Sequence, residues 1–110
     1  MEEKIVVQSL AALAQPFRLR VFKALVVAGA NGSTPSVLSE QLAIPATTLS
    51  FHLKELTYAG LVSQEREGRN IVYKAAFEQM TQLMGYLLEN CCEGDANKSC
   101  PPMKSLKSKC

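Results

Sequence analysis

The sequence is poor in the residues that most catalytic and metal sites use. It has one histidine, and none of its four cysteines lies before residue 91. It has no Ser-His-Asp set, glycine-rich phosphate loop or histidine-based metal cluster, so a catalytic role is not expected. It also lacks a run of about 18 apolar residues, which a membrane-spanning helix needs. The first ten residues lack the basic segment of a secretory signal, and we therefore expect a cytoplasmic protein without a membrane partner.

The net charge of +2 is too small to indicate a nucleic-acid partner by itself. Its distribution tells more, because basic residues are common in the middle of the chain and acidic residues lie mostly towards its two ends. A chain of 110 residues fits one domain with a modest core. We expect residues 1–92 to form a DNA-binding and dimerisation domain, and residues 93–110 to form a flexible tail with cysteine and lysine.

The spacing of apolar residues predicts a mainly helical chain. The expected helices cover residues 3–14, 16–29, 35–43, the stretch between the 44–46 turn and Gly60, and 76–92. Thr34 followed by Pro35 is a strong start signal, because a hydroxyl caps a helix and proline suits its first position. Leu19 in the second helix and Val37 in the third are expected to point inward.

The stretch from residue 44 to residue 62 has two unlike faces on a helical wheel. One face, which suits a core, holds Leu49, His52, Leu53 and Leu56. The opposite face holds Thr47, Ser50, Phe51 and Lys54. Hydroxyls and lysine can bond base edges or phosphates, and an apolar group can contact a thymine methyl, so this face suits a major-groove reader. An ordinary amphipathic helix with one exposed aromatic ring is the alternative.

Residues 61–75 alternate on either side of a turn at residues 67–69, which predicts a two-stranded hairpin. A helix-turn-helix followed by such a hairpin is the order of a winged helix. Arg66 and Arg69 flank the turn, and we expect them on the DNA backbone or in the minor groove rather than simply in solvent. The predicted fold is mainly α with a β-hairpin wing, a winged helix-turn-helix with about five helices. The predicted contacts to double-stranded operator DNA are Thr47, Thr48, Ser50, Phe51, Lys54, Arg66 and Arg69.

The helix at residues 76–92 carries more apolar side chains than one small domain needs. Together with the first helix it predicts the seam of a homodimer, and twofold proteins of this kind bind palindromic sites. The alternative is that this face covers only the core of its own domain.

Residues 10–90 resemble the ArsR/SmtB family of bacterial metal-responsive repressors, and four segments within them carry the resemblance. They are LAQPFRLRVF at 13–22, LSFHLKEL at 49–56, AGLV at 59–62 and REGRNIVY at 66–73. The resemblance implies a homodimer that binds operator DNA, blocks transcription and releases the DNA when an inducer binds. Phe51 departs from the family pattern, because many members carry a polar residue at this position.

Two metal sites that are common in this family are missing here. The third helix has no Cys-x-Cys pair, the fifth has no Asp and His, and His52 is expected in the core. We therefore expect Cys91, Cys92 and Cys100 to bind the inducer, with Cys110 as a loosely tethered substitute. Three soft thiolates without histidine suit As(III), or Sb(III), better than zinc, which prefers four ligands. The resemblance supports this choice, because arsenic-responsive members carry thiols in their C-terminal region. No organic cofactor is expected.

Other interpretations of the thiols stay open. A structural disulfide is disfavoured in the cytosol. A redox sensor or a sensor of another soft metal is possible, although a helix C-terminus and the nearby Glu89 and Glu93 disfavour a reactive thiolate at Cys91 and Cys92. A different class of function is a protein-interaction module whose tail stores metal.

Overall fold

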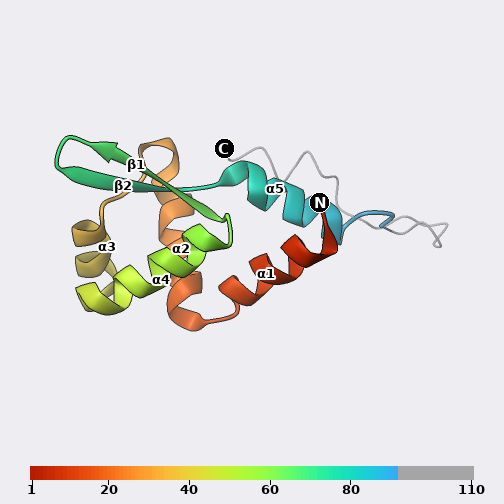
Figure 1. The fold of residues 1–110 in the computed structure, drawn as a ribbon, viewed down its shortest axis with the longest axis horizontal. Coiled ribbons are helices and arrows are strands. Elements are labelled where there is room, and N and C mark those ends of the chain that lie inside the picture. Colours follow the sequence, from red (N-terminus) through yellow and green to blue (C-terminus); the bar gives the residue numbers. More distant parts are fainter. Residues whose placement is uncertain (92–110) are drawn as a thin grey trace.

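The computed structural model describes residues 1–91. Within these residues the elements are α1 (Glu3–Leu13), α2 (Pro16–Ala28), the 3-10 turn η1 (Gly29–Asn31), α3 (Pro35–Leu42), α4 (Ala46–Tyr58), β1 (Val62–Glu67), β2 (Asn70–Ala75) and α5 (Phe77–Leu87). Helices α2, α3 and α4 form the body, and the hairpin lies beside them (Figure 1). The prediction of a winged helix-turn-helix is confirmed. None of the helices in the described part of the chain is long and apolar enough to cross a bilayer.

The core lies where α2, α3, α4 and the base of the hairpin meet. Its largest fully buried apolar side chains are Val21, Leu25, Leu38, Leu49, Leu53, Leu56 and Leu61. Local signals fix the helix starts around it. Thr34 Oγ1 accepts a hydrogen bond from the Val37 amide at 3.5 Å, and Gln15 Oε1 accepts one from the Arg18 amide at 2.9 Å. The Thr34 cap was predicted from the sequence, whereas the Gln15 cap was not.

The predicted inward positions of Leu19 and Val37 are wrong. Leu19 is 46% exposed and Val37 is 52% exposed. The buried stripe of α2 is centred on Val21, Phe22 and Leu25, and Leu19 falls outside its edge. Helix α3 has only eight residues, and Leu38 is the one among them that is buried. The core therefore covers fewer of the apolar side chains on α2 and α3 than the sequence indicated.

The wing is an antiparallel hairpin in which Val62 pairs with Ala75 and Glu67 pairs with Asn70. Gly68 and Arg69 form the two-residue turn, and Gly68 has the positive φ (+65°) that such turns need at their first position. Glu67, which was predicted in the turn, instead ends β1. The base of the wing is also fastened to the loop before α3, because Ser33 and Tyr73 exchange backbone hydrogen bonds of 2.9 and 2.8 Å. This pairing was not predicted.

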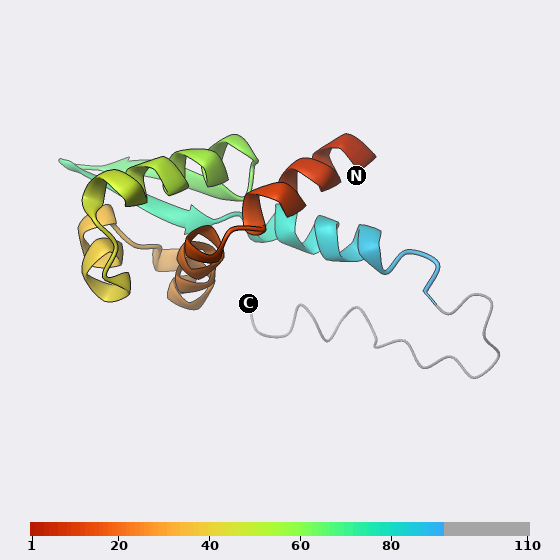
Figure 2. The ribbon, with the colours of Figure 1, turned by 90° about the horizontal axis from the view of Figure 1, so that it is seen from below.

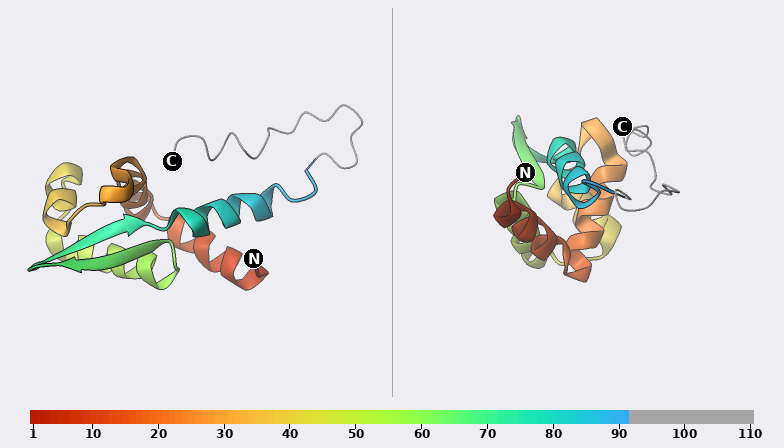
Figure 3. Two further views of the ribbon diagram at one scale, coloured as in Figure 1. Left: turned by 90° about the horizontal axis from the view of Figure 1, so that it is seen from above. Right: turned by 90° about the vertical axis from the view of Figure 1, so that its right-hand side faces the viewer.

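Helices α1 and α5 lie side by side and project from the body at the end opposite the wing tip (Figures 1 and 3). Gln79 Nε2 on α5 donates a hydrogen bond of 3.3 Å to Ser9 Oγ, which is fully buried. The apolar side chains that this pair leaves exposed are Ile5, Val7 and Leu10 on α1 and Leu87 on α5. The pair thus buries one side of α1 and leaves these four apolar side chains exposed to solvent.

Helix α5 ends at Leu87, so the predicted end at residue 92 is wrong. Asn90 adopts a left-handed conformation (φ +61°), which interrupts the helical path, and the Cys91 amide donates to the Leu88 carbonyl at 3.0 Å. Cys91 therefore lies in a turn beyond the helix rather than in its last turn.

Candidate nucleic-acid interface

Helix α4 divides as its sequence predicted. Leu49, His52, Leu53 and Leu56 are all buried. On the opposite side Thr47, Ser50, Phe51 and Lys54 are exposed, and Thr48 is half-buried at the edge. One helix therefore anchors itself in the core through four side chains and presents hydroxyls, an ammonium and a phenyl ring to a partner.

The turn before α4 sets the position of this exposed face. Ala43 adopts a left-handed conformation (φ +55°) at the end of α3, and Ser39 Oγ donates to the carbonyl of Ile44, whose own side chain is buried. No side chain among the described residues caps α4, which begins after Pro45. The amide groups of its first turn are thus open to an external acceptor, and phosphate oxygens are suitable acceptors at a helix N-terminus.

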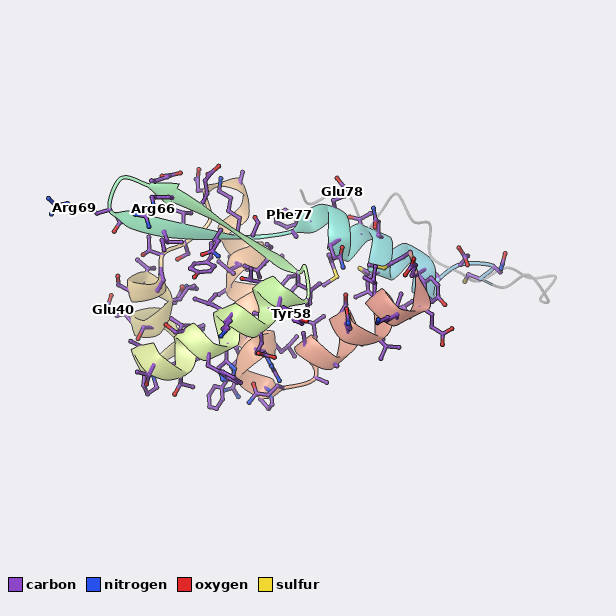
Figure 4. All side chains as sticks on the ribbon, viewed as in Figure 1. Glu40, Tyr58, Arg66, Arg69, Phe77 and Glu78 are labelled. Atoms are coloured by element: carbon purple, nitrogen blue, oxygen red, sulfur yellow. The ribbon has the colours of Figure 1, made fainter. Side chains whose placement is uncertain are left out.

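The wing lies on the same side of the molecule as α4. Seen from below, α4 and the hairpin run along one side, and α2 and α3 occupy the other (Figure 2). Arg66 and Arg69 lie at the outer end of the hairpin, and the Arg69 side chain extends away from the ribbon (Figure 4). The seven predicted DNA contacts therefore all lie on α4 and the hairpin, which run along the same side of the molecule.

A groove of about 320 Å³ separates α4 from the hairpin. Its lining side chains are Ser50, Lys54, Thr57, Tyr58, Gln64 and Tyr73. The sequence analysis singled out only Ser50 and Lys54. The spacing of residues 50, 54 and 58 along one helix face could also have identified Tyr58. Gln64 and Tyr73 face each other across the hairpin and carried no comparable signal.

His52 is a core residue, as predicted. Its ring stacks on Phe17 at 6.0 Å between centroids and meets Phe51 edge-on at 5.6 Å. Burial lowers the pKa of His52, and the positive charge of Arg18 lowers it further, so the imidazole is neutral near pH 7. The contact with His52 also holds the Phe51 ring in place, although the Phe51 residue is 55% exposed.

The lowered pKa of His52 predicts a loss of stability in mild acid. Below the ordinary value of 6.5 the unfolded chain binds a proton that the folded chain resists, so the free energy of unfolding falls as the pH drops from there towards the folded-state pKa. Urea unfolding at pH 7.5 and pH 5.5 measures this loss. The variant His52→Leu should show a smaller loss, because the titrating group is gone. Parallel pH profiles for the two proteins would contradict the prediction.

The predicted thiol ligands are only partly described. Cys91 is exposed and is disulfide-bonded. Cys92, Cys100 and Cys110 lie outside the described residues, as does the predicted tail at 93–110. Residues 1–91 contain no group of three or more His, Cys, Asp or Glu side chains that could hold a metal ion.

Comparison with known proteins gives the same fold. Residues 13–65 match the helix-turn-helix domain family. An ArsR-like transcriptional regulator from Rhodococcus sp. RHA1 is 23% identical with a TM-score of 0.73, over 96% of this chain and 92% of that chain. A comparison with curated protein sequences gave no match.

Two further solved structures are similar over most of their length. One is the homodimeric winged helix-turn-helix DNA-binding domain of a possible ArsR-family regulator from Mycobacterium bovis, with 23% identity, a TM-score of 0.65 and coverage of 90% and 89%. The other is a possible transcriptional regulator for arsenical resistance, with 23% identity, a TM-score of 0.64 and coverage of 94% and 96%. These similarities assign the fold of this chain, which is the winged helix of ArsR-like regulators.

Proposed function

We propose that this chain, which has the winged-helix fold of ArsR-like regulators, is a DNA-binding repressor of transcription that acts as a homodimer in the cytoplasm. The observation that supports this most directly is the exposed face of α4, with Thr47, Ser50, Phe51 and Lys54 next to an arginine-tipped wing. Short hydroxyls and a lysine on a helix supported from behind by the core are suited to base edges and phosphates in the major groove.

Each exposed group has a distinct role in this proposal. Thr47 and Thr48 lie in the uncapped first turn of α4 and bind phosphate with its amides. Ser50 and Lys54 reach base edges or phosphates, and the Phe51 ring contacts a thymine methyl. Arg66 and Arg69 bring positive charge to the adjacent minor groove, whose negative potential attracts arginine.

The apolar side chains that α1 and α5 leave exposed support the homodimer. Ile5, Val7 and Leu10 lie on one helix and Leu87 on its neighbour, and burying them against a second copy removes apolar surface from water. The Mycobacterium bovis domain with the same fold is homodimeric. Twofold symmetry would set two α4 helices about one DNA turn apart, roughly 34 Å, so that they meet successive major grooves.

For the inducer we propose As(III), or Sb(III), bound by the thiolates of Cys91, Cys92 and Cys100. Soft sulphur ligands select such ions, and the exposed position of Cys91 leaves its sulphur accessible once it is reduced. One protein of the same fold is a possible regulator for arsenical resistance. Binding of the ion would lower the affinity for DNA, and allosteric coupling of this kind is typically about 1–3 kcal/mol.

The variant Cys91→Ser tests this function. In a fluorescence titration of the protein's own promoter duplex under reducing conditions, the variant should bind DNA like the wild type but no longer release it when arsenite is added. Cys110→Ser is the matched control and should still release the DNA. If Cys91→Ser responds to arsenite as the wild type does, the proposed thiol site is wrong. If the wild type does not bind the duplex, the repressor function itself is wrong.

A second candidate function is a repressor controlled by thiol oxidation, which the disulfide at Cys91 favours. The same titration separates the two functions when an oxidant replaces arsenite. A redox regulator changes its DNA affinity between the oxidised and the reduced protein without any metal, whereas an arsenite regulator needs the reduced thiols and the ion.

A further inference from the structure

The groove between α4 and the wing has an unusual composition for a surface hollow. Each of its six lining side chains ends in a hydrogen-bond donor: two aliphatic hydroxyls, two phenols, one amide and one ammonium. None of these six described side chains carries a carboxylate. A groove of donors with one positive charge matches a ligand that offers closely spaced, negatively charged acceptor oxygens.

Most of these donors are available to a ligand. Tyr58 is 86% exposed, and Lys54 is also exposed. Thr57 differs, because its hydroxyl donates to the Leu53 carbonyl at 2.7 Å and is thereby satisfied within α4. Glu65 follows Gln64 on β1, so its carboxylate lies on the opposite face of the hairpin, where it accepts a hydrogen bond of 2.9 Å from Lys74.

The position of the groove indicates which anion it takes. It lies between the exposed face of α4 and the hairpin. These two elements run along the same side of the molecule (Figure 2). A duplex that presents its major groove to α4 and its minor groove to the wing tip must pass the sugar-phosphate strand that separates those grooves over this hollow. That strand is a chain of singly charged phosphodiesters.

We propose that this groove binds the phosphodiester backbone of duplex DNA, with Tyr58, Gln64 and Tyr73 as contacts in addition to Lys54 and Ser50. The proposal rests on the proposed DNA-binding function and extends it to residues that were not among the seven predicted DNA contacts. Because phosphates are the same at every base pair, these contacts supply affinity and hold the register of α4 without selecting sequence.

The test uses the variants Tyr58→Phe and Gln64→Ala of the full chain, measured by fluorescence anisotropy with two duplexes of unrelated sequence. Hydrogen bonds to charged groups contribute about 1.5–3 kcal/mol, so each variant should bind DNA at least roughly tenfold more weakly than the wild type. The factor should be similar for the two duplexes. Tyr86→Phe removes the same hydroxyl from α5, away from the groove, and should leave both affinities unchanged.

Salt dependence distinguishes these neutral donors from cations. The slope of log affinity against log salt counts the cations that neutralise phosphates, so Tyr58→Phe should leave it unchanged, while Arg69→Ala should lower it by about one unit. Unchanged affinities for both groove variants, or losses that differ between the two duplexes, would overturn the proposal. Wild-type protein that binds neither duplex would instead show that the DNA-binding function has failed.

Discussion

Replacing Ser50 with glutamate is expected to weaken duplex binding by at least about a hundredfold without unfolding the protein. Ser50 lies on the exposed face of α4, so a longer side chain meets no core atoms. The new carboxylate would lie against phosphates and base-edge acceptors, and facing like charges across an interface costs several kcal/mol. Fluorescence anisotropy with the promoter duplex measures the loss, and thermal unfolding verifies that the fold is intact.

Val27→Glu is the control for this prediction. Val27 is an exposed residue of α2 that does not line the groove between α4 and the wing, and the substitution adds the same charge. It should reduce DNA affinity only slightly, through the change in net charge. Equal losses for the two variants would mean that α4 has no special part in binding.

Gly32→Ala is expected to cause the largest loss of folding stability. Gly32 has φ +67° and ψ −162°, a conformation that is essentially restricted to glycine, so any other residue costs about 1–3 kcal/mol. An added Cβ would also lie 2.5 Å from the Tyr73 carbonyl oxygen and 2.7 Å from side-chain atoms of Val72 and Lys74. Relieving that overlap costs about as much again. The sum is a large part of the roughly 5–15 kcal/mol that stabilises a domain.

Gly29→Ala separates the two costs. Gly29 has nearly the same backbone conformation (φ +69°, ψ −146°), but nothing lies within 4 Å of its added Cβ. Urea unfolding should therefore show a moderate loss for Gly29→Ala and about twice that loss for Gly32→Ala. Equal losses would indicate that the base of the wing yields freely to the new methyl group.

The parts of the fold that repeat along the chain could be predicted from the sequence. Leu49, His52, Leu53 and Leu56 recur at helical spacing and face one core, so both sides of α4 followed from periodicity. The start of α3 followed from Thr34 and Pro35, because capping is a local property. The hairpin followed from alternation around a turn that contains Gly68.

The parts that depend on distant contacts could not be predicted. Leu19 and Val37 are apolar, but the spacing does not tell which apolar residues a small body can cover. Apolar residues continue past Leu87, so periodicity gave no stop signal for α5, and the left-handed Asn90 became evident only in the structure. The groove could not be predicted either, because its lining residues come from α4 and from both strands of the hairpin, which only the fold brings together.

The pairing of Ser33 with Tyr73 has a mechanical consequence. The hairpin ladder continues to its root, where the Ala76 amide donates to the Leu61 carbonyl at 2.8 Å, and the Leu61 side chain is fully buried in the core. The root of the hairpin is therefore held by the core as well as by the Ser33–Tyr73 pairing. The distance between the wing tip and α4 is then fixed within each chain. On the proposed function, release of DNA would then come from a change in the angle between the two copies of the dimer rather than from a movement of the wing within one copy.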